Sequence, residues 1–357
     1  MFDHPTLIFD LGSYNIKAGN RYDDYPQIIQ SAFPAGHHDY PIDKSLPMDC
    51  LPDRVISKGE IINEDRMNFI LASIFDKTFP ANQPEPEDLY AIINFPPFPS
   101  RKHIEKLGYA MFEILSTDSI ILYPSTYMSQ IQFALNNSIC VDVGYDITQV
   151  ATIEDNHFYP HSSLKSYSAG ASLDLFTSFD QFNIMEYKKW EHMEQARQKK
   201  EKESVCSLKF EDDISTNEDI FPFICGELLF NPALYESIST EGEKVNDHVS
   251  MLIEQPSVAE IIKNSIELCH ENNRKIMWNN IIVTGGTSKM NGFRERLKKD
   301  LHEIAPVGAK PRLIFPDDPQ TNTWKGGQQL VSTHENWLNI TDYKEDPDSI
   351  FNRFVKY

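Results

Sequence analysis

Ile8-Phe9-Asp10-Leu11-Gly12 opens the chain, and Cys140-Val141-Asp142-Val143-Gly144 repeats its pattern 132 residues later. In each copy apolar residues surround one aspartate and lead to a glycine, which predicts a buried strand that ends in a tight turn. Return strands are expected at Ile16–Gly19 and Thr148–Glu154. Either copy alone is a common pattern, so chance is the alternative. The repeat nevertheless favours two duplicated lobes with a ligand between them.

The two turns carry the residue types that phosphate binding needs. Successive backbone N–H groups in a tight turn form an anion-binding nest, and Gly12 and Gly144 let a ligand approach the backbone closely. Ser13 adds a hydroxyl, and Lys17 can reach a phosphate as a point charge. Asp10 and Asp142 would face each other and hold a hydrated Mg²⁺, which keeps several of its waters.

Composition narrows the function classes. The 357 residues suit two lobes, and a 40% hydrophobic content is enough to bury two cores. The net charge of −20 disfavours direct nucleic-acid binding and favours basic protein partners, histones among them. The five scattered cysteines indicate reduced thiols and not a disulfide framework or zinc site. We expect no signal peptide and no membrane span, and so a soluble protein of the nucleus or cytosol.

Strand and helix signals alternate along the rest of the chain. Asn63-Glu64-Asp65 predicts a helix start, with amphipathic spacing over 65–78. Residues 31–55 are expected to be irregular, 186–206 to form a charged, solvated helix, and 208–220 to be an acidic loop. Further helices are expected at 101–116, from after Leu122 to about Leu135, at 256–275 and at Phe293–His302, and further strands at Tyr90–Phe95, Ser119–Leu122, Ser138–Val143 and Trp278–Val283.

Several segments, in order along nearly the whole chain, resemble the actin family of actins and actin-related proteins. Phe9–Gly19 is similar to the family's first phosphate loop and Cys140–Gln149 to the second. The other similar segments are Ser168-Ala169-Gly170, Lys202-Glu203-Ser204-Val205-Cys206, Cys225–Pro232, Val283–Ser288 with Asn291-Gly292-Phe293, and Trp324-Lys325-Gly326-Gly327.

The resemblance implies an α/β, actin-like fold of two duplicated ribonuclease-H-like lobes around a nucleotide cleft. Lobe I would comprise residues 1–132 and 322–357, with a small second subdomain at about 33–58. Lobe II would comprise residues 133–321, with a reduced fourth subdomain at about 169–237.

The resemblance also implies a site for ATP or ADP with Mg²⁺. Asp10 and Asp142 would hold the metal through water. The implied phosphate-binding residues are Asp10, Gly12, Ser13, Tyr14, Lys17, Asp142, Gly144, Tyr145 and Asp146. The implied adenosine-binding residues are Gly170, Lys202, Glu203, Gly285, Gly286, Thr287 and Ser288.

Departures from the family pattern point away from catalysis. Tyr145 stands where the second loop would carry a further acid, and Gln149 replaces a histidine that helps to place the attacking water. The family's water-orienting glutamine falls near Ser125 or Tyr127, and Tyr14 replaces a glycine. Hydrolysis depends on a water in line with the γ-phosphate. We therefore expect no enzyme beyond a vestigial ATPase, with the nucleotide as a structural link between the lobes.

Three function classes follow. The first is a non-catalytic architectural subunit of a multiprotein complex. The second is a cytoskeletal actin-related protein at filament ends or in a dynactin-type complex. The third is a sugar kinase or a heat-shock ATPase, which we do not expect, because a kinase would need a second carboxylate as base and a heat-shock ATPase a substrate domain. The segments at 33–58 and between Cys206 and Cys225 are shorter than the corresponding regions of actin, which make contacts along the filament. The resemblance therefore implies that this protein forms no homopolymer.

The C-terminal third most resembles the actin-related protein 6 subfamily. The segments that carry this are Asn280–Gly286, Gly292–Arg296 and Phe315–Gly327, together with Gly12-Ser13-Tyr14-Asn15. That subfamily sits in nuclear chromatin remodellers that exchange a variant histone. Protein subunits of a remodeller would then be the partners, and the nucleus the location, with the cytoplasm as the alternative.

Overall fold

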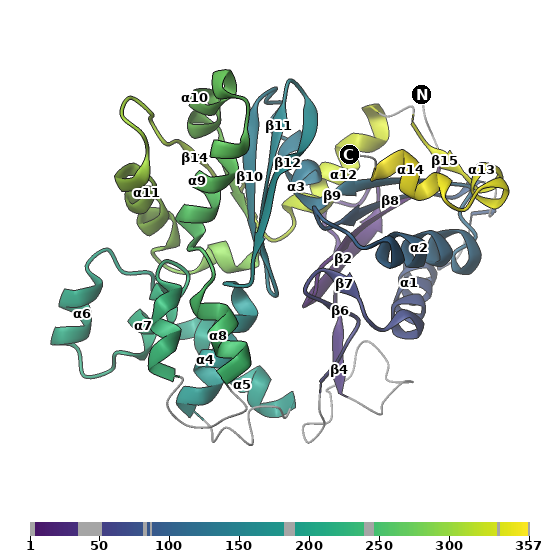
Figure 1. Ribbon diagram of the computed structural model, residues 1–357. Coiled ribbons are helices and arrows are strands. Elements are labelled where there is room, and N and C mark those ends of the chain that lie inside the picture. The colour runs from purple at the N-terminus through teal and green to yellow at the C-terminus, as the bar shows by residue number, and fades with distance from the viewer. Residues whose placement is uncertain are drawn as a thin grey trace.

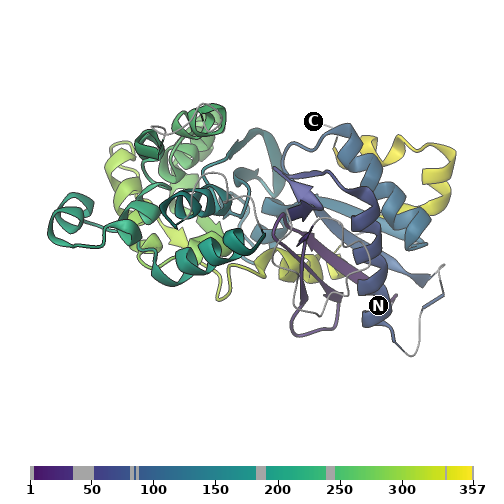
Figure 2. The same cartoon turned by 90° about the horizontal axis from the view of Figure 1, so that it is seen from below.

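The computed structural model describes residues 4–34, 52–80, 84–85, 88–181, 190–238, 246–333 and 336–355. Two lobes stand side by side, each built on one sheet with helices outside it (Figure 1). Seen from below, the lobes again lie next to one another (Figure 2). Most of the segment expected to be irregular, residues 35–51, lies outside the described residues, as does Cys50.

The first lobe carries a six-stranded sheet in the order β15-β9-β8-β1-β2-β3. The central strand β1 pairs in parallel with β8 and antiparallel with β2. The strands are β1 (Thr6–Leu11), β2 (Asn15–Asn20), β3 (Gln27–Gln30), β8 (Tyr90–Phe95), β9 (Ser119–Pro124) and β15 (Leu338–Asn339).

The second lobe repeats this arrangement in a five-stranded sheet ordered β12-β11-β10-β13-β14. Its central strand β10 is parallel to β13 and antiparallel to β11, as β1 is to β8 and β2. The strands are β10 (Ser138–Val143), β11 (Thr148–Glu154), β12 (His157–Ser166), β13 (Ile281–Thr284) and β14 (Leu313–Ile314). The repeated Asp-x-Gly pattern thus ends the equivalent strand of each lobe.

Helices cover both sheets. The first lobe has α1 (Glu64–Thr78), α2 (Arg101–Tyr109) with a π-helical end (Ala110–Ile114), α3 (Ser125–Ile131), α12 (Asn322–Thr333), α13 (Ile340–Glu345) and α14 (Ser349–Phe354). The second has α4 (Gly170–Gln181), α5 (Trp190–Glu203), α6 (Phe210–Thr216), α7 (Phe221–Glu227), α8 (Asn246–Ile253), α9 (Val258–Leu268), α10 (Glu271–Asn279) and α11 (Phe293–Ile304). Short elements complete the fold: β4 (Ala32–Pro34) with β5 (Pro52–Arg54), β6 (Ile56–Ser57) with β7 (Glu60–Ile61), and 3-10 turns at Pro232–Ile238 and Gly286–Lys289.

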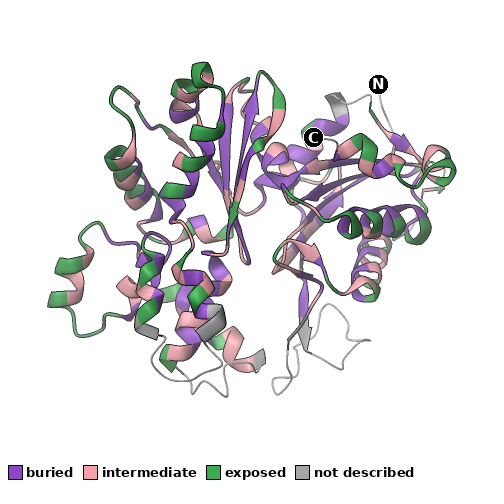
Figure 3. Ribbon diagram, in the orientation of Figure 1, coloured by how far each residue is buried: buried purple, intermediate pink, exposed green. Residues whose placement is uncertain are grey.

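Strand β1 is buried on both faces, which explains its unbroken apolar run. Leu7 and Phe9 belong to the core under α1 and α2, while Ile8 on the opposite face packs with Trp324 of α12. A strand covered by helices on both sides needs apolar residues at every position. Figure 3 shows the result, with buried strands at the centre of each lobe and exposed outer helix faces.

Most expected elements are present, and the two-lobed α/β architecture is confirmed. The hairpin strands, the strand at Tyr90–Phe95, and the helix that begins after Asn63 match the expectation. The Asn63 side chain accepts a hydrogen bond from the Arg66 N–H, as an N-cap does. The lobe boundaries at residues 132/133 and 321/322 stay predictions.

Three expectations in the second lobe were wrong. Residues 208–220 contain α6, whose first turn carries Glu211, Asp212 and Asp213, and acidic side chains stabilise a helix N-terminus. The single helix at 256–275 is two helices, because Cys269 is extended, with ψ 162°. Trp278 lies in the last turn of α10, which ends at Asn279, and β13 begins only at Ile281. In the first lobe, α3 ends at Ile131, earlier than the expected Leu135.

Among the described residues, no helix combines the length and the apolar character needed to cross a bilayer. The four cysteines in this part of the chain, Cys140, Cys206, Cys225 and Cys269, are free and buried.

The contact between α12 and α3 predicts a sensitive glycine. A Cβ at Gly326 would lie 1.7 Å from the Met128 carbonyl oxygen, so Gly326→Ala should lower the free energy of unfolding by about 3 kcal/mol through overpacking. Urea unfolding of the two proteins measures this. The matched control is Gly286→Ala, whose added methyl meets no atom within 4 Å. Equal losses in the two variants would contradict the packing argument.

Candidate functional site

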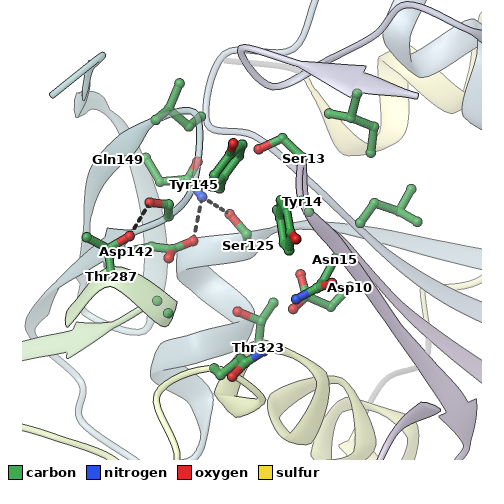
Figure 4. Close-up of a pocket in the computed structure, with 18 of the residues that line it drawn as sticks. Asp10, Ser13, Tyr14, Asn15, Ser125, Asp142, Tyr145, Gln149, Thr287 and Thr323 are labelled. Carbon is green, nitrogen blue, oxygen red and sulfur yellow. Dashed lines mark hydrogen bonds between the residues drawn. The ribbon is translucent and has the colours of Figure 1, made fainter. Parts of the chain in front are cut away.

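A cavity of about 500 Å³ lies between the lobes, at the ends of both hairpins. This size falls within the range of roughly 300–1,000 Å³ that is typical of small-molecule sites. Residues of both Asp-x-Gly turns and of the 285–290 segment line it, and Figure 4 shows several of their side chains pointing toward one another.

The first turn is held by a network around Asp10. The Asn94 amide donates to Asp10 Oδ1 over 2.7 Å, while the Leu11 N–H donates to Asn94 Oδ1, also over 2.7 Å. Lys17 Nζ lies 3.0 Å from Asp10 Oδ2, and β-sheet register places Lys17 directly opposite Asp10. A Cβ at Gly12 would lie 2.6 Å from the Asn15 carbonyl oxygen, so this tight turn requires a glycine.

The second turn uses glutamine where the first uses lysine. Gln149 lies opposite Asp142 in the sheet and donates from Nε2 to Asp142 Oδ2 and to Ser125 Oγ, each over 2.7 Å. Burial raises the pKa of Asp142 to about 6, the charge of Asp10 adds to this rise, and the Gln149 hydrogen bond opposes it. A Cβ at Gly144 would lie 2.9 Å from the Ile147 carbonyl oxygen.

The expected adenosine loop forms the wall beside the second turn. Gly285 has φ +92°, and a Cβ there would lie 2.4 Å from the Val143 carbonyl oxygen. Gly286 faces open space within the lining, and the Thr287 hydroxyl donates to the Gly144 carbonyl over 2.8 Å. Ser288 is buried and donates to the Gly285 carbonyl, so it supports the turn and does not line the cavity.

The expected Lys202-Glu203 pair does not line the cavity; Arg197, Lys200 and Glu201 do. These three positions share one face of α5, because residues three and four apart are neighbours on a helix. Lys202 is exposed to solvent. Two consecutive Lys-Glu pairs occur in the sequence, and the motif does not distinguish them; the face of α5 that lines the cavity does.

Lys200 is held in place by two other residues of the second lobe. Its Nζ lies 2.6 Å from Asp174 Oδ1 and donates to the Gly170 carbonyl over 3.1 Å. Gly170 thus lies behind Lys200 and is not among the lining residues, and a Cβ there would lie 2.8 Å from Thr287 Oγ1.

The two substituted positions of the turns, Tyr14 and Tyr145, and the neighbouring Asp146 connect the lobes. The rings of Tyr14 and Tyr145 lie with centroids 4.8 Å apart, one from each turn (Figure 4). Asp146 is buried away from the cavity lining, where it accepts from Arg54 over 2.9 Å and from the Lys58 N–H over 2.8 Å. The Asp146 N–H donates to Ser13 Oγ over 3.3 Å.

Of the expected site residues, the cavity lining unites those of both turns, except Asp146, with residues 285–287 of the glycine loop. The members are Asp10, Gly12, Ser13, Tyr14, Lys17, Asp142, Gly144, Tyr145, Gly285, Gly286 and Thr287. Sequence reasoning missed Asn94, although it follows from the parallel pairing of β8 with β1, which brings their carboxyl ends to one edge. Ser125, one of the two candidate positions for the water-orienting glutamine, lines the cavity, and Tyr127 does not.

The chemistry of this lining fits a nucleotide. The close-approach glycines and Lys17 suit phosphates, and the open face at Gly286 between α5 and the 319–320 segment suits a base. Within the described ranges no group of three or more His, Cys, Asp or Glu side chains is placed to hold a metal ion. Asp10 and Asp142 both line the cavity, and Mg²⁺ bound between them would keep several of its waters. Both ligand assignments stay predictions.

His103, which lines the cavity, predicts that the stability of the protein depends on pH. Burial lowers its pKa from 6.5 to about 4, so the folded protein binds this proton less readily than the unfolded chain. The stability it contributes is complete above the unfolded pKa and is lost as pH falls toward the folded one. Between about pH 7 and pH 4.5, wild type should lose roughly 2–3 kcal/mol more than His103→Gln in urea unfolding. Parallel losses would contradict this.

Comparison with known proteins agrees with this geometry. The family model described as Actin matches residues 2–210 and 176–355. A Dictyostelium discoideum protein named "Putative actin-29" is 26% identical over 285 residues, which cover 72% of this chain and 70% of that protein. Proteins of this family generally bind ATP or ADP with a divalent metal. The family match spans nearly the whole chain, and the chain belongs to the actin family.

Proposed function

We propose that this protein is a non-catalytic, non-polymerising actin-related subunit that holds ATP or ADP as a structural ligand within a larger complex. The observation that carries the proposal is the Gln149 amide, which donates to both Asp142 and Ser125. An amide neither accepts a proton as a base does nor changes charge, and here its Nε2 is engaged by Asp142 and by Ser125, one of the two candidate positions of the family's water-orienting glutamine.

Binding groups are retained while water-positioning groups are replaced. Lys17, Gly12 and Gly144 would receive the phosphates, Asp10 and Asp142 would hold hydrated Mg²⁺, and the base would lie between Gly286 and the Arg197–Glu201 face of α5. A nucleotide with Mg²⁺ supplies charged contacts to both lobes and so favours their closed arrangement. At the positions where the family carries the groups that orient an attacking water, this chain has Ser125, Tyr145 and Gln149 instead.

The complex we propose is a nuclear chromatin remodeller that exchanges a variant histone. This rests on the resemblance of Phe315–Gly327 and Gly292–Arg296 to the actin-related protein 6 subfamily. The net charge of −20 supports basic protein partners, such as remodeller subunits and histones, over nucleic acid. A cytoskeletal subunit at filament ends or in a dynactin-type complex is the alternative.

Restoring the missing groups tests the non-catalytic assignment. Wild type should release negligible phosphate from ATP, whereas Ser125→Gln with Gln149→His should raise the rate roughly 10- to 100-fold by re-forming a water-positioning pair. Phosphate release under single-turnover conditions is the measurement. Tyr127→Gln with Gln149→His is the matched control, because Tyr127 stacks on Tyr123 outside the cavity lining. Robust steady-state hydrolysis by wild type would contradict the proposal.

Affinity purification of the tagged full chain with mass spectrometry separates the two kinds of complex. We expect a helicase-like remodelling motor and its subunits, because the proposed partners are remodeller proteins. Recovery of dynactin or filament-branching subunits instead would favour the cytoskeletal alternative. The purified protein should form no filaments in electron micrographs, and long homopolymers would refute the non-polymerising part.

A further inference from the structure

Tyr14 crosses the cleft from the first lobe to the second. Its hydroxyl donates to Glu194 Oε1 of α5 over 2.7 Å and accepts from the Gln30 side-chain amide over 2.9 Å. The register of β2 with β3 sets Gln30 opposite Asn15, and the Ser31 N–H donates to the Tyr14 carbonyl over 2.8 Å. The first lobe therefore holds Tyr14 in place at its backbone and at its hydroxyl.

The ring of Tyr14 also contacts the second lobe. It lies 4.8 Å, centroid to centroid, from the Tyr145 ring, and the Arg197 guanidinium lies 5.0 Å from its centroid. Arg197 is held in turn by Glu194, 2.9 Å away. Burial raises the pKa of the Tyr14 phenol well above its usual range, so the hydroxyl keeps the proton that it donates to Glu194.

Tyr14 stands as a partition between two hollows. Together with Asn15 and Arg197 it lines the nucleotide cavity, and the same three residues line a second, more open hollow bordered by residues 27–30, Lys77 and Glu194. A side chain that lines both hollows separates them. At this side of the cleft, a ligand would have to pass the Tyr14 ring.

A second contact connects the two lobes next to the contacts of Tyr14. Arg54 and the Lys58 N–H of the first lobe both bind the buried Asp146 carboxylate of the second. The Arg54 guanidinium lies 5.4 Å from the Tyr145 centroid, which links this ion pair to the stacked tyrosines. A buried, hydrogen-bonded ion pair resists separation, because opening the cleft would break it.

We propose that Tyr14, latched to Glu194 and Gln30, gates the exchange of the ligand and holds the lobes together before any ligand binds. The gating half of this inference rests on the proposed nucleotide site, whereas the latch itself rests only on contacts between side chains. Release of a bound nucleotide then requires the Tyr14 hydroxyl to leave Glu194 and its ring to leave Tyr145.

The experiment follows release of a fluorescent N-methylanthraniloyl ADP into excess ADP by stopped flow. Tyr14→Ala removes both the hydroxyl and the ring and should speed release at least tenfold, since a hydrogen bond to a charged group accounts for about that factor. Tyr14→Phe keeps the ring and loses the hydroxyl, so its rate should fall between the other two. Tyr22→Ala, in an exposed turn of the same lobe, is the matched control and should match wild type.

Hydrogen–deuterium exchange of the nucleotide-free proteins tests the latch separately. Peptides from residues 9–19 and 190–203 should take up deuterium faster in Tyr14→Ala than in wild type, with α11 unchanged. Unaltered release and unaltered exchange in Tyr14→Ala would overturn the inference. If the fluorescent nucleotide binds neither wild type nor the variants, the nucleotide proposal and the gating half fail, and the exchange data alone decide whether the latch exists.

Discussion

Each lobe bends its central strand through a tight glycine turn into an antiparallel neighbour, and this places one carboxylate at the end of each hairpin. Register then puts a side chain opposite that carboxylate, Lys17 opposite Asp10 and Gln149 opposite Asp142. Because the two sheets share this arrangement, the turns meet at one cleft. The candidate site and the side-chain contacts between the lobes both lie at this meeting point of the two turns.

In the function that we propose, the difference between Lys17 and Gln149 is the reason why a nucleotide would be bound but not hydrolysed. Lys17 brings a positive charge to the first carboxylate, which suits a site for phosphates. Gln149 brings a neutral amide to the second and joins it to Ser125. Tyr14 and Tyr145 lie one on each turn, and the contact between their rings connects the two lobes directly. On this proposal, closure of the cleft would depend on protein side chains as well as on a ligand.

Sequence reasoning succeeded where a short pattern determines local structure. The hairpins, the capped helix after Asn63 and the glycine turn at Gly285 each depend on neighbouring residues, and each was predicted. It failed where position depends on distant packing. Residues 256–275 have continuous helical spacing, yet the helix ends before Cys269, whose buried Sγ donates to Thr152 Oγ1 of β11 over 3.7 Å.

In the candidate site, too, local patterns could be predicted from the sequence, whereas contacts between distant residues could not. Both Lys-Glu pairs of α5 satisfy the motif, and only the face that α5 turns toward the cleft selects Lys200-Glu201 over Lys202-Glu203. Asn94 and Arg54 lie far along the chain from the residues they bind, so no local pattern announces them. Tyr14 could be recognised as a substitution for glycine, but its contact with Glu194 is set by the approach of the second lobe.

The central claim is that the cleft holds an adenine nucleotide without consuming it. Native mass spectrometry of the full chain, incubated with ATP and Mg²⁺ and freed of excess ligand, measures both parts at once. The predicted result is a protein mass increased by one nucleotide, with that nucleotide still ATP after hours. A chain that carries no nucleotide, or one that has promptly converted it to ADP, would contradict the account.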